Sequence, residues 1–169
     1  MGRATDNSLL DRISAVTGRV TAWLTLFMVV VTFIVVVMRY LFDAGFIWVQ
    51  ESVVWMHAVV FMLGAAYTLR DEEHVRVDVF YRTMSARKRA WVDIVGVVIF
   101  LLPLCVFLAW NSWDFVAQSW SIRESSREPG GLPYPFLPLL KSVILLMPVA
   151  VALQGLSLFL AALRTVRER

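Results

Sequence analysis

The chain has 169 residues, of which 59% are hydrophobic and 17% are charged, and its formal net charge is +3. Soluble domains carry about a quarter charged residues, so this composition excludes an ordinary water-soluble protein and indicates one that lies in lipid. The single cysteine, Cys105, excludes a disulfide or a thiol-exchange pair within the chain. Cys105 stands in an apolar run, where it is expected to act as a small apolar residue. We expect membrane lipid, and no nucleic acid, around this chain.

Four apolar runs are long enough to cross a membrane, and they cover residues 20–38, 52–69, 94–113 and 142–163. At 1.5 Å per residue each run forms a helix of about 27–33 Å, which matches a hydrocarbon core of about 30 Å. We therefore predict an all-α integral membrane protein with four transmembrane helices in a single domain, 1–169. The leader 1–19 contains acidic residues and no small-residue cleavage site follows the first run, which indicates a permanent helix rather than a signal peptide.

The basic residues predict how the helices are oriented. Twelve of the sixteen lysines and arginines lie in the leader, in the connection between the second and third runs, and in the C-terminal tail. The other four are Arg39, Arg123, Arg127 and Lys141. Because basic residues are retained on the cytoplasmic side, both termini and the middle connection are predicted to be cytoplasmic.

The connection between the first two runs, RYLFDAGFIWVQE, is aromatic, which is typical of a membrane interface. Arg39 and Glu51 stand at its two ends, each at the edge of a helix. We predict that these two residues meet as a partly desolvated ion pair, which would fix the angle between the first two helices.

His57 is the one titratable residue deep in an apolar run. Haem held between membrane helices usually needs paired histidines, and the chain's two histidines, His57 and His74, are expected at different depths. The sequence therefore argues against a b-type cytochrome, and we expect no cofactor, no metal and no catalytic residue.

The segment 69–80, LRDEEHVRVDVF, gathers seven ionisable residues between two apolar runs. A metal site would need His74, Asp78 and Glu73 to converge, but one histidine among carboxylates is a poor ligand set for a transition metal. We favour a cytoplasmic anchor that attracts anionic lipid and docks a partner, followed by a short helical segment in the headgroup layer. Asp78 or Ser85 is expected to cap a helix N-terminus, with Ser85 opening the third run.

The third run and the connection after it contain most of the prolines. Asp93 lies near the start of the run, within reach of the interface or of Arg89 one turn earlier. A helical extension is predicted over 113–124, and the proline- and glycine-rich stretch 129–138 then predicts a turn or an irregular ordered loop. Pro103 and Pro148 are predicted to kink the third and fourth helices.

Several short motifs occur in a defined order along the chain. They are RY and W..E around the first two runs, LR…HVRVD after the second, W…ES…GGLP in the external loop, and K…LQG in the fourth run. This order resembles the small membrane subunit of tripartite ATP-independent periplasmic (TRAP) transporters over nearly the whole chain after the leader. The ES…GGLP loop with LQG is most similar to the branch for mannitol, chloroaromatic or keto-acid substrates.

The resemblance implies a small scaffold subunit in the bacterial inner membrane, and not an enzyme. Its partners would be a large membrane subunit and a periplasmic substrate-binding protein, which together import an organic acid by sodium symport. The implied interface or structural residues are Arg39, Tyr40, Trp48 and Glu51 in the first hairpin, Arg70, His74, Arg76 and Asp78 in the cytoplasmic motif, Glu124 in the external loop, and Lys141 and Gln154 in the last helix.

Two other functions stay open on the residues alone. A stand-alone small transporter or channel would need a carboxylate in the middle of a span, whereas Glu51 lies at the edge of a helix. A membrane enzyme would need a nucleophile–base pair or a cluster of metal ligands, and no such pattern is present in the sequence.

Overall fold

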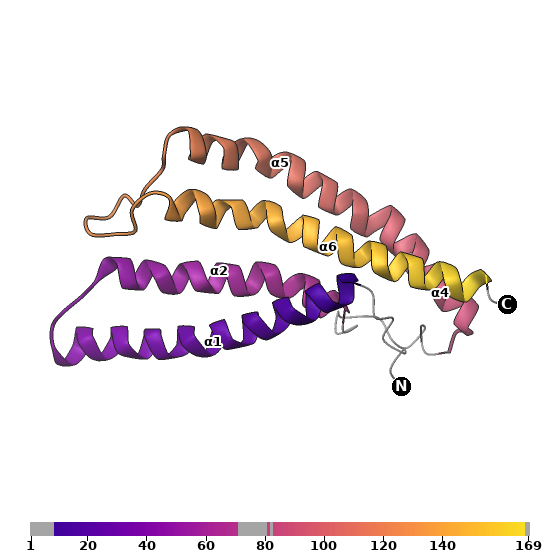
Figure 1. Cartoon of the computed structure of the whole chain (residues 1–169), viewed down its shortest axis with the longest axis horizontal. Helices are drawn as coiled ribbons and strands as arrows, with labels where there is room; N and C mark the ends of the chain where they lie inside the picture. The colour runs from indigo at the N-terminus through magenta and orange to yellow at the C-terminus, as the bar shows by residue number, and fades with distance from the viewer. Residues whose placement is uncertain (1–8, 71–80, 82, 168–169) are drawn as a thin grey trace.

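The structure is a computed structural model that describes residues 9–70, 81 and 83–167. Its first hairpin consists of α1 (Leu9–Leu41) and α2 (Ile47–Arg70), which run antiparallel (Figure 1). The described residues form helices and connections with no strand, and four helical segments are long and apolar enough to cross a membrane. The predicted all-α fold with four membrane-crossing helices is confirmed.

The second hairpin is built from a composite helix and a long continuous one. Its parts are α4 (Ala86–Val95), the π-helical η1 (Gly96–Leu101), α5 (Leu102–Ser121) and α6 (Phe136–Arg167). The extension predicted beyond residue 113 is helical up to Ser121. Ser85 is the N-cap residue of α4, as predicted, but its side chain makes no capping hydrogen bond.

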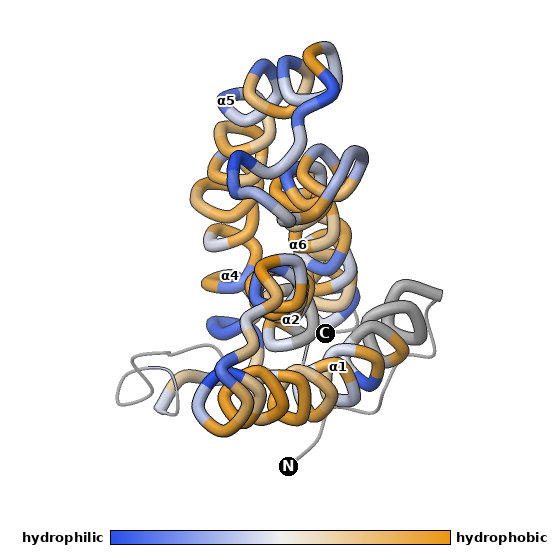
Figure 2. Tube along the Cα trace, turned by 90° about the vertical axis from the view of Figure 1, so that its left-hand side faces the viewer, coloured by the Kyte–Doolittle hydropathy of each residue, from blue (hydrophilic) through white to orange (hydrophobic). Residues whose placement is uncertain are grey.

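The helices lie in an open layer in the order α1, α2, α6, α5 (Figure 2). α2 packs between α1 and α6, and α6 packs between α2 and α5. In the most apolar part of α6, 22% of the residues are buried, whereas in the corresponding part of α1 none is buried. The edge helix α1 therefore leaves large apolar side chains such as Trp23 and Phe33 exposed.

Small residues bring α4 close to the end of α6. Ala90 and Ala162 are both 0% exposed and share a buried cluster with Ile94. Alanine allows helix backbones to approach closely, and in a membrane this packing replaces the hydrophobic effect as the source of helix association. The cluster therefore fixes the start of the third span against α6.

Two prolines shape the second hairpin. Pro103 opens α5, and the turn before it is π-helical, with the Leu102 N–H donating to the Val97 carbonyl five residues earlier. Proline lacks an N–H and crowds the preceding turn, which the wider π register accommodates. Pro148 lies inside α6 and is fully buried.

Candidate functional site

The connections 42–46 and 122–135 lie at the same end of the layer, opposite the C-terminus (Figure 1). We call this the loop end. Glu51, in the second turn of α2, points its carboxylate at the loop 122–135. The Ser126 hydroxyl donates to one carboxylate oxygen, and the Leu132 N–H donates to the other at 2.6 Å. Each oxygen of Glu51 therefore has a donor from a segment about eighty residues further along the chain.

The loop 122–135 contains a tight turn at Pro129 and Gly130, two residues that favour turns. The Gly131 N–H donates to the Glu128 carbonyl at 3.0 Å, which closes a four-residue turn with Pro129 and Gly130 at its centre. Gly130 has a φ of +80°, and proline followed by a glycine of positive φ is the signature of a type II turn. The predicted turn is confirmed. It brings Ser126 and Leu132 together, since the Ser126 N–H donates to the Leu132 carbonyl at 3.1 Å.

Gly131 leaves the space in which Glu51 meets the loop. A Cβ added at this residue would lie 2.6 Å from the Ser126 Cβ and 2.8 Å from the Glu51 Oε1. Both distances are shorter than real Cβ contacts allow. The absence of a side chain at Gly131 is therefore a condition of the Glu51–Ser126 contact.

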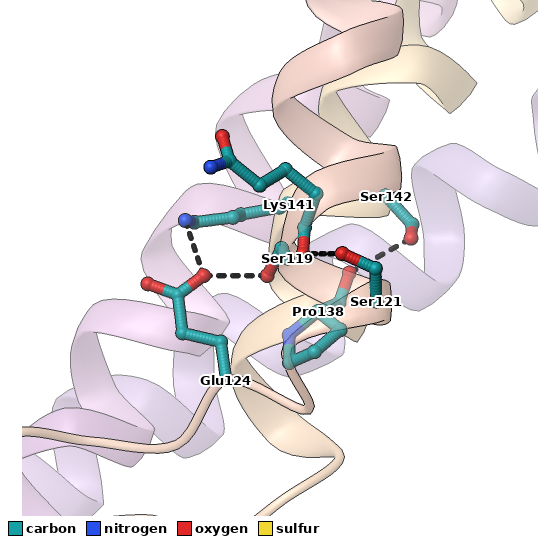
Figure 3. A network of polar contacts seen from close by, with 7 residues as sticks. Ser119, Ser121, Glu124, Pro138, Lys141 and Ser142 are labelled. Carbon is teal, nitrogen blue, oxygen red and sulfur yellow. Dashed lines mark hydrogen bonds and ion pairs between the residues drawn. The ribbon is translucent and has the colours of Figure 1, made fainter.

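A second carboxylate at the loop end ties the start of α6 to the end of α5 (Figure 3). The Lys141 ammonium lies 2.5 Å from the Glu124 Oε2, and the Ser119 hydroxyl donates to the same oxygen at 2.6 Å. Lys141 also lies over the Phe115 ring, 4.1 Å from its centroid. Ser119 is 1% exposed, so its hydroxyl depends on this carboxylate for a partner.

The hydrogen bonds from Lys141 and then from Ser119 lower the pKa of the Glu124 carboxyl from its ordinary value of 4.5. A carboxyl with a lower pKa in the folded state stabilises the fold above its unfolded-state pKa, and this contribution is lost as the pH falls through the lowered value. We expect the wild-type chain to lose more stability than Glu124→Gln between about pH 6 and pH 3. Thermal unfolding in detergent measures this difference, and equal losses in the two proteins would contradict it.

Two indole groups add links across the loop end. The Trp55 Nε1–H donates to the Phe136 carbonyl at 3.2 Å, which joins α2 to the start of α6. The Trp120 Nε1–H donates to the Ser142 hydroxyl at 3.0 Å, which joins α5 to α6. The Trp48 N–H donates to the Gly130 carbonyl at 3.2 Å. Together with Glu51, the Trp55 and Trp48 contacts brace the first hairpin against the second, whereas the Trp120 contact lies within the second hairpin.

The predicted Arg39–Glu51 ion pair is wrong. Arg39 is exposed in the last turn of α1, while both oxygens of Glu51 receive hydrogen bonds from the loop. α1 ends at Leu41, and the chain then turns away, with Asp43 at a φ of +51° and the Ala44 N–H donating to the Met38 carbonyl. The prediction considered only the first hairpin, and the donors that satisfy Glu51 come from the second.

The remaining predicted residues take no part in the contacts of Glu51 and Glu124. Tyr40 lies at the loop end, in the last turn of α1, but is 81% exposed, and Gln154 is 3% exposed within α6. Arg70 is the last residue of α2, but its side chain lies outside the described part of the structure. The other cytoplasmic candidates, His74, Arg76 and Asp78, and the headgroup-layer segment fall in 71–80, also outside the described residues.

Asp93 has a partner that the sequence did not suggest. The Tyr81 hydroxyl lies 2.9–3.0 Å from the two Asp93 carboxylate oxygens. The Arg89 guanidinium lies 5.6 Å from the centroid of the Tyr81 ring. Tyr81 therefore joins the residues before α4 to its second and third turns.

Sequence reasoning missed Ser119, Ser126 and the Leu132 N–H as partners of the two carboxylates. The ES…GGLP motif contains Glu124 and Leu132, and it was the one signal that pointed to this loop. Among the described residues, no group of three or more histidine, cysteine, aspartate or glutamate side chains is placed to hold a metal ion. The contacts at the loop end connect helices.

The geometry defines a multi-pass helical membrane protein whose polar contacts at the loop end connect its two hairpins. Residues 28–168 match the family described as tripartite ATP-independent periplasmic transporters, DctQ component. The chain belongs to this family, and it is therefore a transporter component and not an enzyme.

A curated relative has 31% identity over 114 residues, and it is the C4-dicarboxylate TRAP transporter small permease protein DctQ of Vibrio cholerae serotype O1. The match covers 65% of this chain and 49% of the relative, so this chain spans about half the length of that protein. No solved structure matches the chain.

Proposed function

We propose that this chain is the small scaffold subunit of a sodium-driven TRAP transporter in the bacterial inner membrane. Its partners are a large membrane subunit, which carries the substrate and sodium sites, and a periplasmic binding protein, which delivers the substrate. Both termini lie in the cytoplasm, and the loop end faces the periplasm. The match to the DctQ component over 28–168 is the observation that carries this proposal.

The open layer supports a scaffold role. A layer of four helices has two broad faces, and here apolar side chains on α1 and α5, such as Phe33 and Phe107, are more than half exposed. The acidic residues of the described spans lie toward helix ends, with Glu51 in the second turn of α2, Asp93 in the third turn of α4 and Asp114 about two turns before the end of α5. A transport path through the membrane would need a carboxylate at mid-depth.

The name of the relative and the motif pattern support a proposed substrate class. The relative's name specifies a C4-dicarboxylate, and the ES…GGLP loop is similar to a branch for mannitol, chloroaromatic or keto-acid substrates. We assign an organic acid as the cargo of the assembled transporter. The chain itself supplies no substrate site in this proposal.

Co-purification tests the proposed assembly. A large TRAP membrane subunit is expressed with an affinity tag, and this chain is expressed untagged in the same cells. We expect both chains to elute together in a constant ratio after detergent extraction and size-exclusion chromatography. An unrelated four-helix membrane protein replaces this chain as the control. Elution of a folded large subunit without this chain would contradict the proposal.

A further inference from the structure

One narrow face of α2 remains uncovered at mid-depth. Val54 is 63% exposed, Phe61 is 72% exposed, and His57 between them is also exposed. Residues at spacings of three and four lie on the same side of an α-helix, so these three side chains form one stripe. We call this stripe the His57 face.

The other sides of α2 are occupied by neighbouring helices. Met56, one residue before His57, is 7% exposed. Trp55 donates to the Phe136 carbonyl of α6, and the Cβ position of Gly64 lies 3.9 Å from Thr21 of α1. At the depth of His57, α2 therefore has neighbours within this chain on the sides of Trp55, Met56 and Gly64, and the His57 face is the exposed side.

His57 is a polar residue placed where lipid tails would surround it. The span of α2 covers Ile47–Ala65, so at 1.5 Å per residue His57 lies about 12–15 Å from either end. Its ring stacks on Phe61 with a centroid distance of 6.4 Å, and no hydrogen bond within the described part of the chain reaches either ring nitrogen. A histidine side chain is too short to reach the headgroups from this depth. Lipid tails offer its imidazole no hydrogen-bond partner.

We propose that a membrane helix of the large subunit covers the His57 face and presents a hydrogen-bonding group to the imidazole. This inference rests on the proposed function, because it takes the large subunit as the partner. Val54 and Phe61 supply apolar contact on either side of the polar group. The imidazole is the reason to assign the face to protein, since an entirely apolar stripe would be equally well covered by lipid.

Photo-crosslinking locates the contact. A photoreactive amino acid replaces Val54 or Phe61 in the chain co-expressed with the large subunit, and Met56 on the buried side of the same helix serves as the matched control. We expect crosslinks to the large subunit from positions 54 and 61 and none from position 56. If the complex forms but positions 54 and 61 react only with lipid or with a second copy of this chain, the inference is wrong while the proposed function stands. If the unmodified chains form no complex, both fail.

Substitution of His57 tests the hydrogen bond. His57→Leu fills similar space with an apolar side chain and removes the hydrogen-bonding groups, whereas His57→Gln retains hydrogen-bond donors and an acceptor. We expect about three- to tenfold weaker retention of the large subunit for His57→Leu, and retention within about twofold of wild type for His57→Gln.

The isolated chain provides the folding control for these variants. The imidazole has no hydrogen-bond partner within the described part of the chain, so the thermal unfolding temperature of the isolated protein should be the same for both variants and wild type. Wild-type retention by His57→Leu, or equal weakening by both substitutions, would overturn the assignment of a hydrogen bond to this face.

Discussion

Glu51→Ala is expected to destabilise the chain by about 2–4 kcal/mol, because it leaves the Ser126 hydroxyl and the Leu132 N–H without their charged acceptor. The loss should appear in the free energy of unfolding measured in mixed detergent micelles. Glu51→Gln retains an acceptor oxygen and should lose about half as much. The loop 122–135 should also become more sensitive to protease, since it loses its link to α2.

Arg39 provides the control for this prediction. Because Arg39 is exposed and the partners of the Glu51 carboxylate are Ser126 and Leu132, Arg39→Ala should change the free energy of unfolding by less than about 0.5 kcal/mol. A double-mutant cycle between Glu51→Ala and Ser126→Ala should give a coupling of about 0.5–3 kcal/mol. Coupling of Glu51 to Arg39 instead of Ser126 would contradict the brace described at the loop end.

Gly131→Ala is expected to have the second large effect, about 1–3 kcal/mol of destabilisation. The added methyl group would overlap Ser126 and the Glu51 carboxylate, and the short serine side chain has little freedom to move away. The loop must then shift, and its contacts with α2 are lost. The measurement is again the free energy of unfolding in mixed micelles.

Gly45→Ala is the matched control, because a Cβ at Gly45 would have nothing within 4 Å. It should leave the stability within about 0.5 kcal/mol of wild type. In a Glu51→Ala background the cost of Gly131→Ala should fall, since one of the crowded groups is already absent. An undiminished cost in that background would mean that Gly131 acts independently of Glu51.

The four membrane-crossing helices were predictable because their length follows from the thickness of a bilayer. The helices are longer than the apolar runs, and α6 shows why. The fourth apolar run begins at residue 142 because Lys141 is charged, but α6 begins at Phe136. The charge of Lys141 is compensated by the Glu124 carboxylate and the Phe115 ring. A charged residue ends an apolar run without ending the helix when another part of the fold supplies its partner.

The loop end was only partly predictable. The prolines and glycines of 129–138 predict a turn or an irregular ordered loop from local preferences alone, and the structure contains a turn at Pro129 and Gly130. The acceptor role of Glu51 depends on a backbone N–H eighty-one residues away, at Leu132. No local pattern records such a pairing, so the sequence favoured the nearby Arg39 instead.

The arrangement of the four spans was not evident from the sequence either. Apolar runs of similar length are compatible with a closed bundle or with an open layer, because lipid accepts whichever faces the helices leave uncovered. The open layer is what leaves His57 exposed on α2, and the lengths of the apolar runs do not indicate such a layer.

Uptake into proteoliposomes tests most directly the claim that this chain is a scaffold and transports nothing alone. Vesicles carry this chain, the large subunit, or both, with a sodium gradient, the periplasmic binding protein and labelled C4-dicarboxylates or keto acids. We expect no uptake above protein-free vesicles with this chain alone, and sodium-dependent uptake when both membrane subunits and the binding protein are present. Sodium-driven uptake of an organic acid by this chain alone would contradict the account.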